Sequence, residues 1–263
     1  MRRTFLVLLL ILAPASYAGA STITLTGTVR DFNDTHPDFE DGISGVVTGI
    51  VQPVLGLDQN PVYSGLLIGA THGATAFNQW YNDVAGVNLS APLSITLDNT
   101  ITPDPNIFTF ASNAFFPIDN QLFGNQGRSH NFHFTYEIHS QFTYQGGETF
   151  TFTGDDDLWV FINKTLAVDL GGVHGAATGS VNLDAAAAAL GITTGNVYDF
   201  DLFFAERHTV ASNFRIDTSL VLVQPPAAPE FRGTLSGLPS FGWLFSAGLG
   251  LAGLAVIRRR QEG

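Results

Sequence analysis

Hydrophobic and polar residues alternate most regularly between positions 130 and 139 of the chain. Phe132, Phe134, Tyr136 and Ile138 fall on one side of this alternation, and positions 133, 135, 137 and 139 are polar. A period of two is typical of an antiparallel strand with one face in a core and the other in solvent. The pattern therefore predicts a half-buried strand at this position.

Shorter apolar segments predict further strands and one helix. Positions 158–162 are apolar without interruption, which indicates a central strand buried on both faces, and the next residues predict a hairpin turn with Lys164 where a tight turn usually carries Gly. Asp184 is expected to cap a short helix over residues 185–190 that Gly191 ends. The remaining strands are expected near residues 23–30, 93–97, 150–152, 166–170, 198–204 and 214–223. Residues 21–223 are thus predicted to form one all-β domain, an antiparallel β-sandwich or jelly-roll-like fold with one short helix.

The two ends of the chain have the pattern of targeting segments. Residues 1–20 combine Arg2 and Arg3, a short apolar run and a small-residue cleavage pattern, which predicts a secretory signal peptide. Residues 240–257 are apolar over about one bilayer thickness and lead into an arginine-rich tail at 258–263, which predicts a transmembrane or sorting helix with a cytoplasmic end. Residues 224–239, rich in Pro and Ala, are expected to be a linker. We therefore expect the domain to be exported and held at the membrane through its C-terminal helix.

Composition narrows the classes of function. Residues 21–224 contain five basic and 21 acidic residues, so this part of the chain carries a charge of −16 and would repel nucleic acid. The absence of cysteine excludes a disulfide scaffold, thiol catalysis and cysteine-ligated metals. The chain also lacks the sequence motifs of nucleophile-elbow esterases, zincins and P-loop NTPases. The composition favours an acidic, exported β-domain without an evident catalytic motif.

The main candidate for chemistry is a run of three aspartates directly before the most hydrophobic strand. Asp155, Asp156 and Asp157 repel one another and need a cation, hydrogen-bond donors or water to stay ionised. Calcium suits them because it takes six to eight oxygen ligands and is available outside the cell. The alternative is a solvated acidic turn.

Other side chains are weaker candidates. His174, Glu206 and His208 could bind a transition metal or line a ligand site, and the alternative is that Glu206 forms an ion pair with its neighbour while both histidines are ordinary loop residues. Trp80 and Tyr81 could stack on sugar rings or belong to the core. The acidic segment 34–41 meets no metal-ligand spacing rule and is expected to be a solvated loop.

Several long motifs resemble the fibro-slime domain. The resemblance covers roughly residues 28–222, and its motifs are VRDF at 29–32, HPDFE at 36–40, WYND at 80–83, GDDDLWVFIN at 154–163, VDLGGVH at 168–174, GSVNLD at 179–184, FFAERH at 203–208 and SNFRI at 212–216. The C-terminal helix and arginines are similar to the PEP-CTERM sorting signal, although residues 225–231 read PPAAPEF in place of the usual Pro-Glu-Pro element. This resemblance implies sorting or transpeptidase machinery as a partner.

The fibro-slime family is similar to protective-antigen-type sugar-binding β-domains. In those domains an Asp-Asp pair, often joined by a cis peptide bond, and a later Asn hold calcium, and the calcium holds sugar hydroxyls. Carried over, the resemblance implies calcium ligands at Asp155, Asp156 and Asn213. Asp157 stands where the wider superfamily has Gly.

Three functions are compatible with these observations. The first is an exported, non-catalytic module that binds a polysaccharide or glycan through calcium and serves in adhesion at the cell surface or in the extracellular matrix. The second is a structural matrix protein without glycan binding. The third is a secreted glycoside hydrolase that uses two of the loop carboxylates.

Overall fold

The computed structural model describes residues 19–66 and 71–225, and within these residues the chain forms ten strands and two short helices. The strands are β1 (Thr22–Phe32), β2 (Asn88–Asp98), β3 (Phe108–Ser112), β4 (Phe134–Thr143), β5 (Thr149–Asp155), β6 (Asp157–Ile162), β7 (Thr165–Leu170), β8 (Ala177–Asn182), β9 (Val197–Glu206) and β10 (Asn213–Thr218). The helices are α1 (Ala74–Phe77) and α2 (Leu183–Leu190). The all-β class and the segments predicted as strands are confirmed, and β3, β8 and α1 are additions.

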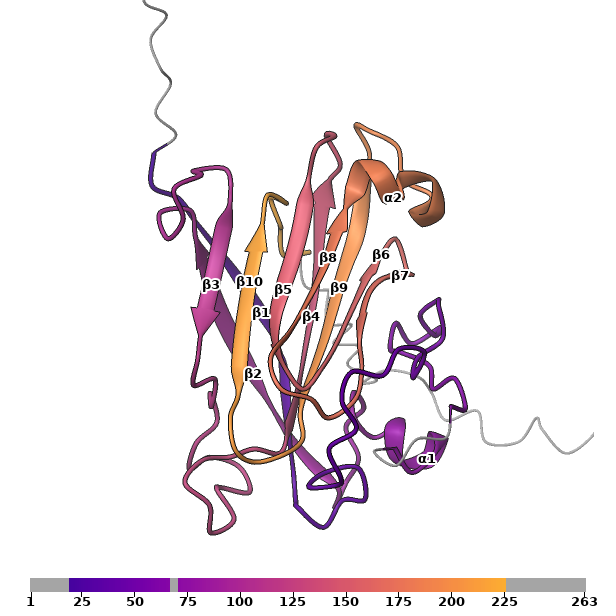
Figure 1. The fold of residues 1–263 in the computed structure, drawn as a ribbon, viewed down its shortest axis with the longest axis vertical. Helices are drawn as coiled ribbons and strands as arrows, with labels where there is room; N and C mark the ends of the chain where they lie inside the picture. Colours follow the sequence, from indigo (N-terminus) through magenta and orange to yellow (C-terminus); the bar gives the residue numbers. More distant parts are fainter. Residues whose placement is uncertain (1–18, 67–70, 226–263) are drawn as a thin grey trace, which may run out of the picture. The chain divides into compact units, whose positions relative to one another are not determined.

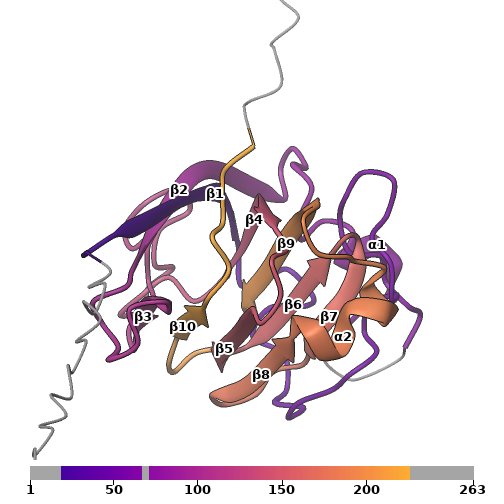
Figure 2. The ribbon, with the colours of Figure 1, turned by 90° about the horizontal axis from the view of Figure 1, so that it is seen from above.

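All strand pairs are antiparallel and belong to one sheet, with the order β7-β6-β9-β4-β1-β2-β3-β10-β5-β8. Seen from above, the sheet curls so that β3, β10, β5 and β8 face the other six strands (Figure 2). The two layers are joined at β2 and β3 by a single residue pair, Asp98 with Thr109. At the other side β7 and β8 pack closely, since a Cβ on Gly179 would meet Val168 at 2.6 Å. The predicted sandwich is therefore a continuous, nearly closed sheet.

The interior of this curled sheet is an aromatic core. Alternate residues of β4, β6, β9 and β10 point into it, as the period of two requires, and Phe134, Leu158, Phe204 and Phe214 are fully buried there. The ring centroid of Phe214 lies 5.0 Å from that of Phe204 and 5.1 Å from that of Phe152, and both contacts are edge-on. Packing of this kind holds the ends of the strands in fixed positions.

A second core lies on the outer face of β6 and β9. It buries Trp80, Trp159, Phe161 and Phe203, and it is covered by the long segment between β1 and β2, which we call the lobe (residues 33–87). Figure 1 shows the lobe, with α1, beside β6 and β7. The run at 158–162 is consequently buried on both faces, as predicted.

The lobe also corrects the prediction for β4. Its outward-facing residues Thr135 and Glu137 are buried as well, and His133, just before the strand, is 1% exposed. Alternation at 132–138 therefore marks two different buried environments, one aromatic and one polar, and the polar side becomes half-exposed only at His139.

The turn after β6 and the two ends of α2 are determined by neighbouring residues. Asn163 and Lys164 both have positive φ, 49° and 63°, between the paired residues at positions 162 and 165, which is the two-residue hairpin expected for this segment. Helix α2 ends at Gly191 in the left-handed conformation, as predicted. Its N-terminal cap is Asn182, whose side chain accepts a hydrogen bond from Ala185 N, and not Asp184, which lies in the first turn.

The predicted signal peptide and C-terminal helix fall almost entirely outside the described residues, which begin at residue 19 and end at residue 225. Only the first two residues of the predicted linker are included. Within the described ranges, no helix has the length and apolar character needed to cross a bilayer.

Candidate functional site

The three aspartates lie where β5 passes into β6, at the end of the sheet that also holds the end of β9 and the start of β10, the lower end in Figure 1. The peptide bond between Asp155 and Asp156 is cis. This is the backbone feature that the resemblance to sugar-binding β-domains implies. Each of the three carboxylates faces a different set of partners.

Asp155 is bound to the first residue of β10. Residues 155 and 213 are register partners, Asp155 Oδ2 accepts a hydrogen bond from Asn213 Nδ2 at 2.8 Å, and Oδ1 accepts one from the Asn213 backbone N–H. The Asp155 side chain is 6% exposed. The structure thus brings together Asp155 and Asn213, which are 58 residues apart in the sequence.

Asp156 is held by two backbone N–H groups from different loops. Its Oδ1 accepts from His174 N at 3.0 Å, and its Oδ2 accepts from Arg207 N at 3.0 Å. Burial raises the pKa of Asp156 to about 7, against the lowering effect of the Arg207 charge, because the ionised form loses solvation there. A cation beside this carboxylate would favour its ionised form.

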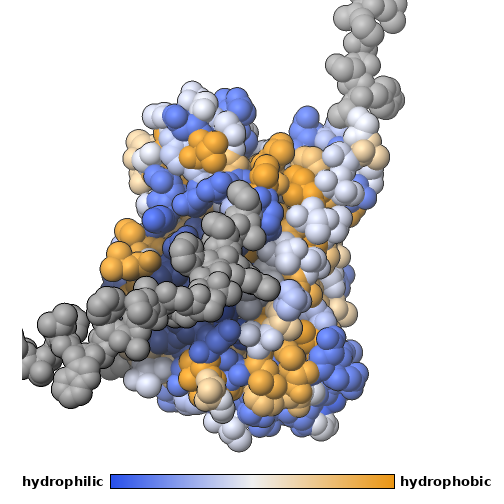
Figure 3. Space-filling model, turned by 180° about the vertical axis from the view of Figure 1, so that it is seen from behind, coloured by the Kyte–Doolittle hydropathy of each residue, from blue (hydrophilic) through white to orange (hydrophobic). Residues whose placement is uncertain are grey.

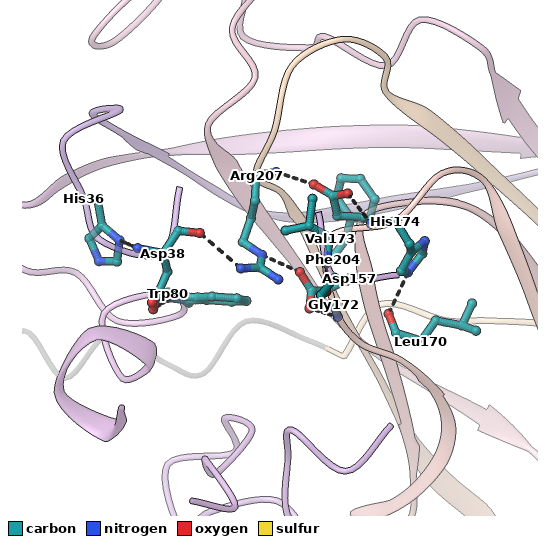
Figure 4. A network of polar contacts seen from close by, with 12 residues as sticks. His36, Asp38, Trp80, Asp157, Leu170, Gly172, Val173, His174, Phe204 and Arg207 are labelled. Carbon is teal, nitrogen blue, oxygen red and sulfur yellow. Dashed lines mark hydrogen bonds and ion pairs between the residues drawn. The ribbon is translucent and has the colours of Figure 1, made fainter. Parts of the chain in front are cut away.

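Asp157 has its charge compensated within the protein. Its Oδ2 accepts from Arg207 Nε at 2.5 Å and its Oδ1 from Gly172 N at 2.6 Å, and both side chains of the ion pair are fully buried. Figure 4 shows the Arg207 guanidinium between Asp157 and the lobe, where it donates to the Asp38 carbonyl at 3.1 Å and lies 4.7 Å above the Trp80 ring centre. Asp157 is therefore part of a structural ion pair, which separates it from its two neighbours.

Glu206, the last residue of β9, is fully buried, and neither of its carboxylate oxygens accepts a well-aligned hydrogen bond from a described residue. Burial raises its pKa well above the usual range, and the nearby charges of Asp156 and Asp155 raise it further, while the Ser212 hydroxyl and the His208 backbone lower it. Glu206 is therefore a buried carboxyl whose neutral form is favoured and which is close enough to Asp156 and Asp155 to be affected by their charges.

Both ring nitrogens of His174 and the Nδ1 of His208 are directed at backbone carbonyls. His174 uses its backbone N–H for Asp156, and its ring nitrogens lie 2.8 Å from Gly175 O and 3.3 Å from Leu170 O (Figure 4). His208 turns Nδ1 towards Thr209 O. In this arrangement both rings interact with backbone carbonyls, which does not support the predicted transition-metal role.

Trp80 and Tyr81 are core residues, and the interpretation as sugar-stacking rings is corrected. Trp80 is fully buried and donates from Nε1 to Asp38 Oδ2 at 2.9 Å, and Tyr81 is 3% exposed and donates to Phe204 O at 3.2 Å. Both rings pack in the second core. Neither has a face available to a ligand.

The acidic segment 34–41 is not the solvated loop that was expected. Asp38 is fully buried, and its side chain accepts from His72 N at 2.7 Å as well as from Trp80. Glu40 Oε1 lies 2.8 Å from His133 Nε2 and accepts from Thr209 N at 3.1 Å. This segment ties the lobe to the loop that leads into Asn213.

The resemblance assigns a cation to Asp155, Asp156 and Asn213. Their side chains supply four carboxylate oxygens and one amide oxygen, the ligand types that calcium prefers. Within residues 19–66 and 71–225, no three His, Asp or Glu side chains converge closely enough to hold a metal by themselves. Calcium at this position would take its remaining ligands from backbone carbonyls, water or a bound molecule.

Residues 91–230, just over half of the chain, match the PA14 domain family. The chain therefore belongs to the PA14 domain family.

Similar curated proteins come from Dictyostelium discoideum. Protein psiR is 42% identical over 222 residues (78% of this chain, 22% of psiR), and protein psiQ is 40% identical over 240 residues (86% of this chain, 24% of psiQ). Protein psiD is 39% identical over 244 residues, which cover 84% of this chain and 47% of psiD. The chain thus spans between about a fifth and a half of the length of these relatives.

Solved structures with a similar arrangement are distant. The PA14 sugar-binding domain from an RTX adhesin is 8% identical with a TM-score of 0.32, over 74% of this chain and 90% of that domain. The PA14 domain of the MpAFP antifreeze protein is 8% identical with a TM-score of 0.33, over 82% of this chain and 90% of that domain.

Proposed function

We propose that this chain is an exported, non-catalytic domain that binds carbohydrate through a calcium ion held by Asp155, Asp156 and Asn213. The observation that carries the proposal is the difference between adjacent carboxylates. Asp157 is neutralised by Arg207, whereas Asp156 is buried with two backbone N–H partners and Asp155 with the backbone and amide groups of Asn213.

Electrostatics support a divalent cation at this position. Asp155 and Asp156 are buried and accept hydrogen bonds from neutral donors, and burial raises the pKa of Asp156 to about 7 although the Arg207 charge lowers it, so a cation beside the pair would favour its ionised form. Glu206 lies close to the pair, and burial together with the charges of Asp156 and Asp155 raises its pKa and favours its neutral form, as expected where acids are crowded without a cation. Calcium would neutralise the pair and keep coordination positions open for hydroxyl groups of a sugar.

Membership in the PA14 domain family supports carbohydrate as the ligand, and the resemblance of the aspartate motif to sugar-binding β-domains points the same way. No single site of this kind is expected to bind tightly, so adhesion would rely on many copies. A role at the cell surface or in the extracellular matrix, with anchoring or sorting through residues 240–263, completes the proposal.

The test is calcium titration of the purified protein by calorimetry, together with thermal melts and a glycan array in calcium or in EGTA. We expect saturable binding with a Kd of about 0.1–1 mM. At a tenfold excess over Kd the protein should gain about 1.4 kcal/mol, or a Tm rise of roughly 3–6 °C.

The Asp155→Asn/Asp156→Asn variant should lose both calcium binding and glycan binding. A matched control is Asp58→Asn/Asp104→Asn, which removes the same charge from two exposed turns. If Asp155→Asn/Asp156→Asn bound calcium as tightly as the original protein, these two residues would not be the calcium ligands. Calcium binding without any glycan binding would support instead a structural matrix protein in which the metal only stabilises the loop.

A further inference from the structure

One peptide bond of the lobe joins the two residue types between which a protein backbone rearranges most easily. Asp41 is followed by Gly42, and no other Asp or Asn in the chain is followed by Gly. The backbone nitrogen that follows an aspartate can attack the side-chain carboxyl carbon and close a succinimide ring. Glycine hinders this attack least, because it has no Cβ and its backbone rotates freely.

The structure places the attacking nitrogen beside the carboxyl group. Gly42 N–H donates to Oδ1 of the adjacent Asp41 at 2.7 Å. In the turns at Asp58, Asp98 and Asp104 the side chain accepts instead from the backbone N–H two positions further on. At Asp41 the two groups that would react are therefore already in contact.

Exposure alone would not distinguish this pair, because hydrophilic side chains are widespread on the surface, as the face in Figure 3 shows. The two oxygens of Asp41 differ: Oδ1 accepts the Gly42 N–H, whereas Oδ2 is buried and accepts no hydrogen bond from a described residue. Gly42 is exposed, and a Cβ built on it would meet nothing within 4 Å. The nitrogen thus has room to move over the carboxyl carbon.

His72 lies beside the unbound oxygen. Its Nδ1 is 3.0 Å from Asp38 Oδ1, which also accepts from His72 N at 2.7 Å, so the hydrogen-bond pattern assigns a hydrogen to Nδ1. The other ring nitrogen, Nε2, lies 3.7 Å from Asp41 Oδ2. Loss of this oxygen as water requires a proton, and Nε2 of a protonated His72 is in position to supply it.

We propose that Asp41 and Gly42 form a site of spontaneous backbone isomerisation in which His72 is the general acid. The Gly42 nitrogen forms a bond to Cγ of Asp41 while the bond from Cγ to Oδ2 breaks. The leaving oxygen takes one proton from the Gly42 N–H and one from His72 and departs as water. Solvent then returns a proton to His72.

Hydrolysis of the ring gives two products. Water that attacks Cγ restores aspartate. Water that attacks the backbone carbonyl carbon of residue 41 gives isoaspartate, in which the main chain runs through the former side chain and the former main-chain carbonyl becomes the free carboxylate. Both products have the mass and charge of the original residue.

Isoaspartate would lengthen the lobe between two fixed attachments. Glu40 N donates to Arg207 O at 2.7 Å before the site, and Ser44 N donates to Val173 O at 3.0 Å after it. The chain between these bonds gains one backbone atom. We therefore expect isomerisation to weaken the attachment of the lobe to the loops that follow β7 and β9.

The experiment incubates the purified full-length protein at physiological temperature and follows the peptide that contains residue 41 by mass spectrometry. The succinimide is measured by the loss of one water, and ring opening in heavy-oxygen water marks both products with one heavy oxygen atom. The variants are His72→Gln, which cannot deliver a proton, and Gly42→Ala, whose methyl group has room. The internal control is Asp58, because the N–H of the next residue donates to Gly56 O at 3.0 Å.

We expect label to accumulate at residue 41 at least about tenfold faster than at residue 58. Gly42→Ala should slow the reaction about tenfold because its Cβ restricts backbone rotation, and His72→Gln should slow it about tenfold or more because the general acid is lost. The isomerised protein, separated by chromatography, should have a Tm roughly 2–4 °C lower, which corresponds to the loss of about one hydrogen bond.

Each part of the inference can fail separately, and none depends on calcium or carbohydrate. Equal labelling at residues 41 and 58, or an unchanged rate in Gly42→Ala, would overturn the site whatever the behaviour of His72→Gln. An unchanged rate in a folded His72→Gln variant would overturn the role of His72. An isomerised protein that melts like the original would overturn the effect on the lobe.

Discussion

The two ends of the curled sheet use carboxylates in opposite ways. At the end opposite the three aspartates, Asp184 accepts hydrogen bonds from Gly147 N and Tyr144 Oη, both at 2.7 Å, and these bonds lower its pKa. At the aspartate end, burial raises the pKa of Asp31 to about 6 and that of Asp156 to about 7. At one end the hydrogen bonds of a turn lower the pKa of Asp184, and at the other end burial raises the pKa of Asp31 and Asp156.

This difference is the reason for proposing a ligand at the aspartate end. A groove of about 720 Å³, lined by Phe142, Val197 and Val221 among others, lies at the opposite end, where Glu148 accepts two backbone N–H groups as Asp156 does at the aspartate end. The aspartate site has acids that the protein itself does not fully compensate. The raised pKa of Asp156, and not the size of a cavity, is the reason for placing the proposed ligand at the aspartate end.

The largest expected effect concerns the buried ion pair at the aspartate end. Arg207→Leu leaves Asp157 buried without its cation, and we expect the free energy of unfolding to fall by about 3–5 kcal/mol, with a Tm decrease of roughly 6–20 °C. Urea denaturation and thermal melts measure this loss.

The control for Arg207→Leu is the double variant Arg207→Leu/Asp157→Asn. Since the amide oxygen introduced at position 157 would still accept the Gly172 N–H bond without carrying a charge, part of the lost stability should return. A loss below about 1 kcal/mol in the single variant would contradict the assignment of Asp157 as a compensated, structural carboxylate.

The second prediction uses pH to compare the ends. The pKa of Asp31 is raised from 3.8 to about 6, so the folded protein binds a proton that the unfolded chain has released, and this contribution to stability is lost as pH rises from about 4 to above 6. In EGTA, the unfolding free energy of the original protein minus that of Asp31→Asn should decrease by up to about 3 kcal/mol as pH rises over this range.

Asp184→Asn, at the other end, should behave with the opposite sign. The folded pKa of Asp184 is lowered, so its contribution is present above its unfolded value of 3.8 and is lost as pH falls through the folded pKa. Parallel pH dependence for the two variants would show that the ends do not differ as described.

Much of the fold could be predicted because strand patterns are local. The apolar run at 158–162, the turn at Asn163 and Lys164 and the stop at Gly191 each depend on a few neighbouring residues, and each is present. Alternation at 130–139 also predicted a strand correctly. It could not reveal that the lobe, which lies earlier in the chain, covers the outer face. His133 and Glu137 are polar residues, and such residues would fit a solvent-exposed face as well as a covered polar one.

The candidate site was predictable in part for the same reason. Asp155 and Asp156 stand out as adjacent acids, and a motif resemblance singled out Asn213, which the structure places against Asp155. The role of Asp157 could not be derived locally, because its partner Arg207 is 50 residues away and is positioned by Asp38 and Trp80 of the lobe. The scarcity of basic residues was the available signal, since each buried Arg in so acidic a chain must serve a specific carboxylate.

The third prediction concerns the turn at Glu148, at the end of the sheet opposite the three aspartates. Glu148 accepts the N–H groups of Gln145 at 2.6 Å and Gly146 at 2.7 Å, one on each oxygen. Glu148→Gln offers only one accepting oxygen, so we expect a loss of about 1–2 kcal/mol and a Tm decrease of roughly 2–8 °C, with calcium binding unaffected. If this variant reduced the calcium affinity several-fold, the two ends would be coupled and the division between them wrong.

The smallest expected effect is a gain in stability at the same end. Lys164 has φ 63°, a left-handed conformation that costs a residue with a Cβ about 1–2 kcal/mol, whereas Gly adopts it freely but loses about 0.5–1 kcal/mol of chain entropy on folding. Lys164→Gly should therefore raise the free energy of unfolding by about 0.5 kcal/mol and Tm by roughly 1–2 °C. Asn163→Gly is the matched comparison, because Asn163 also has positive φ but donates from Nδ2 to Leu190 O at 2.9 Å. That variant loses a hydrogen bond and should show no gain, so a rise in Tm for Asn163→Gly together with a fall for Lys164→Gly would contradict the turn assignment.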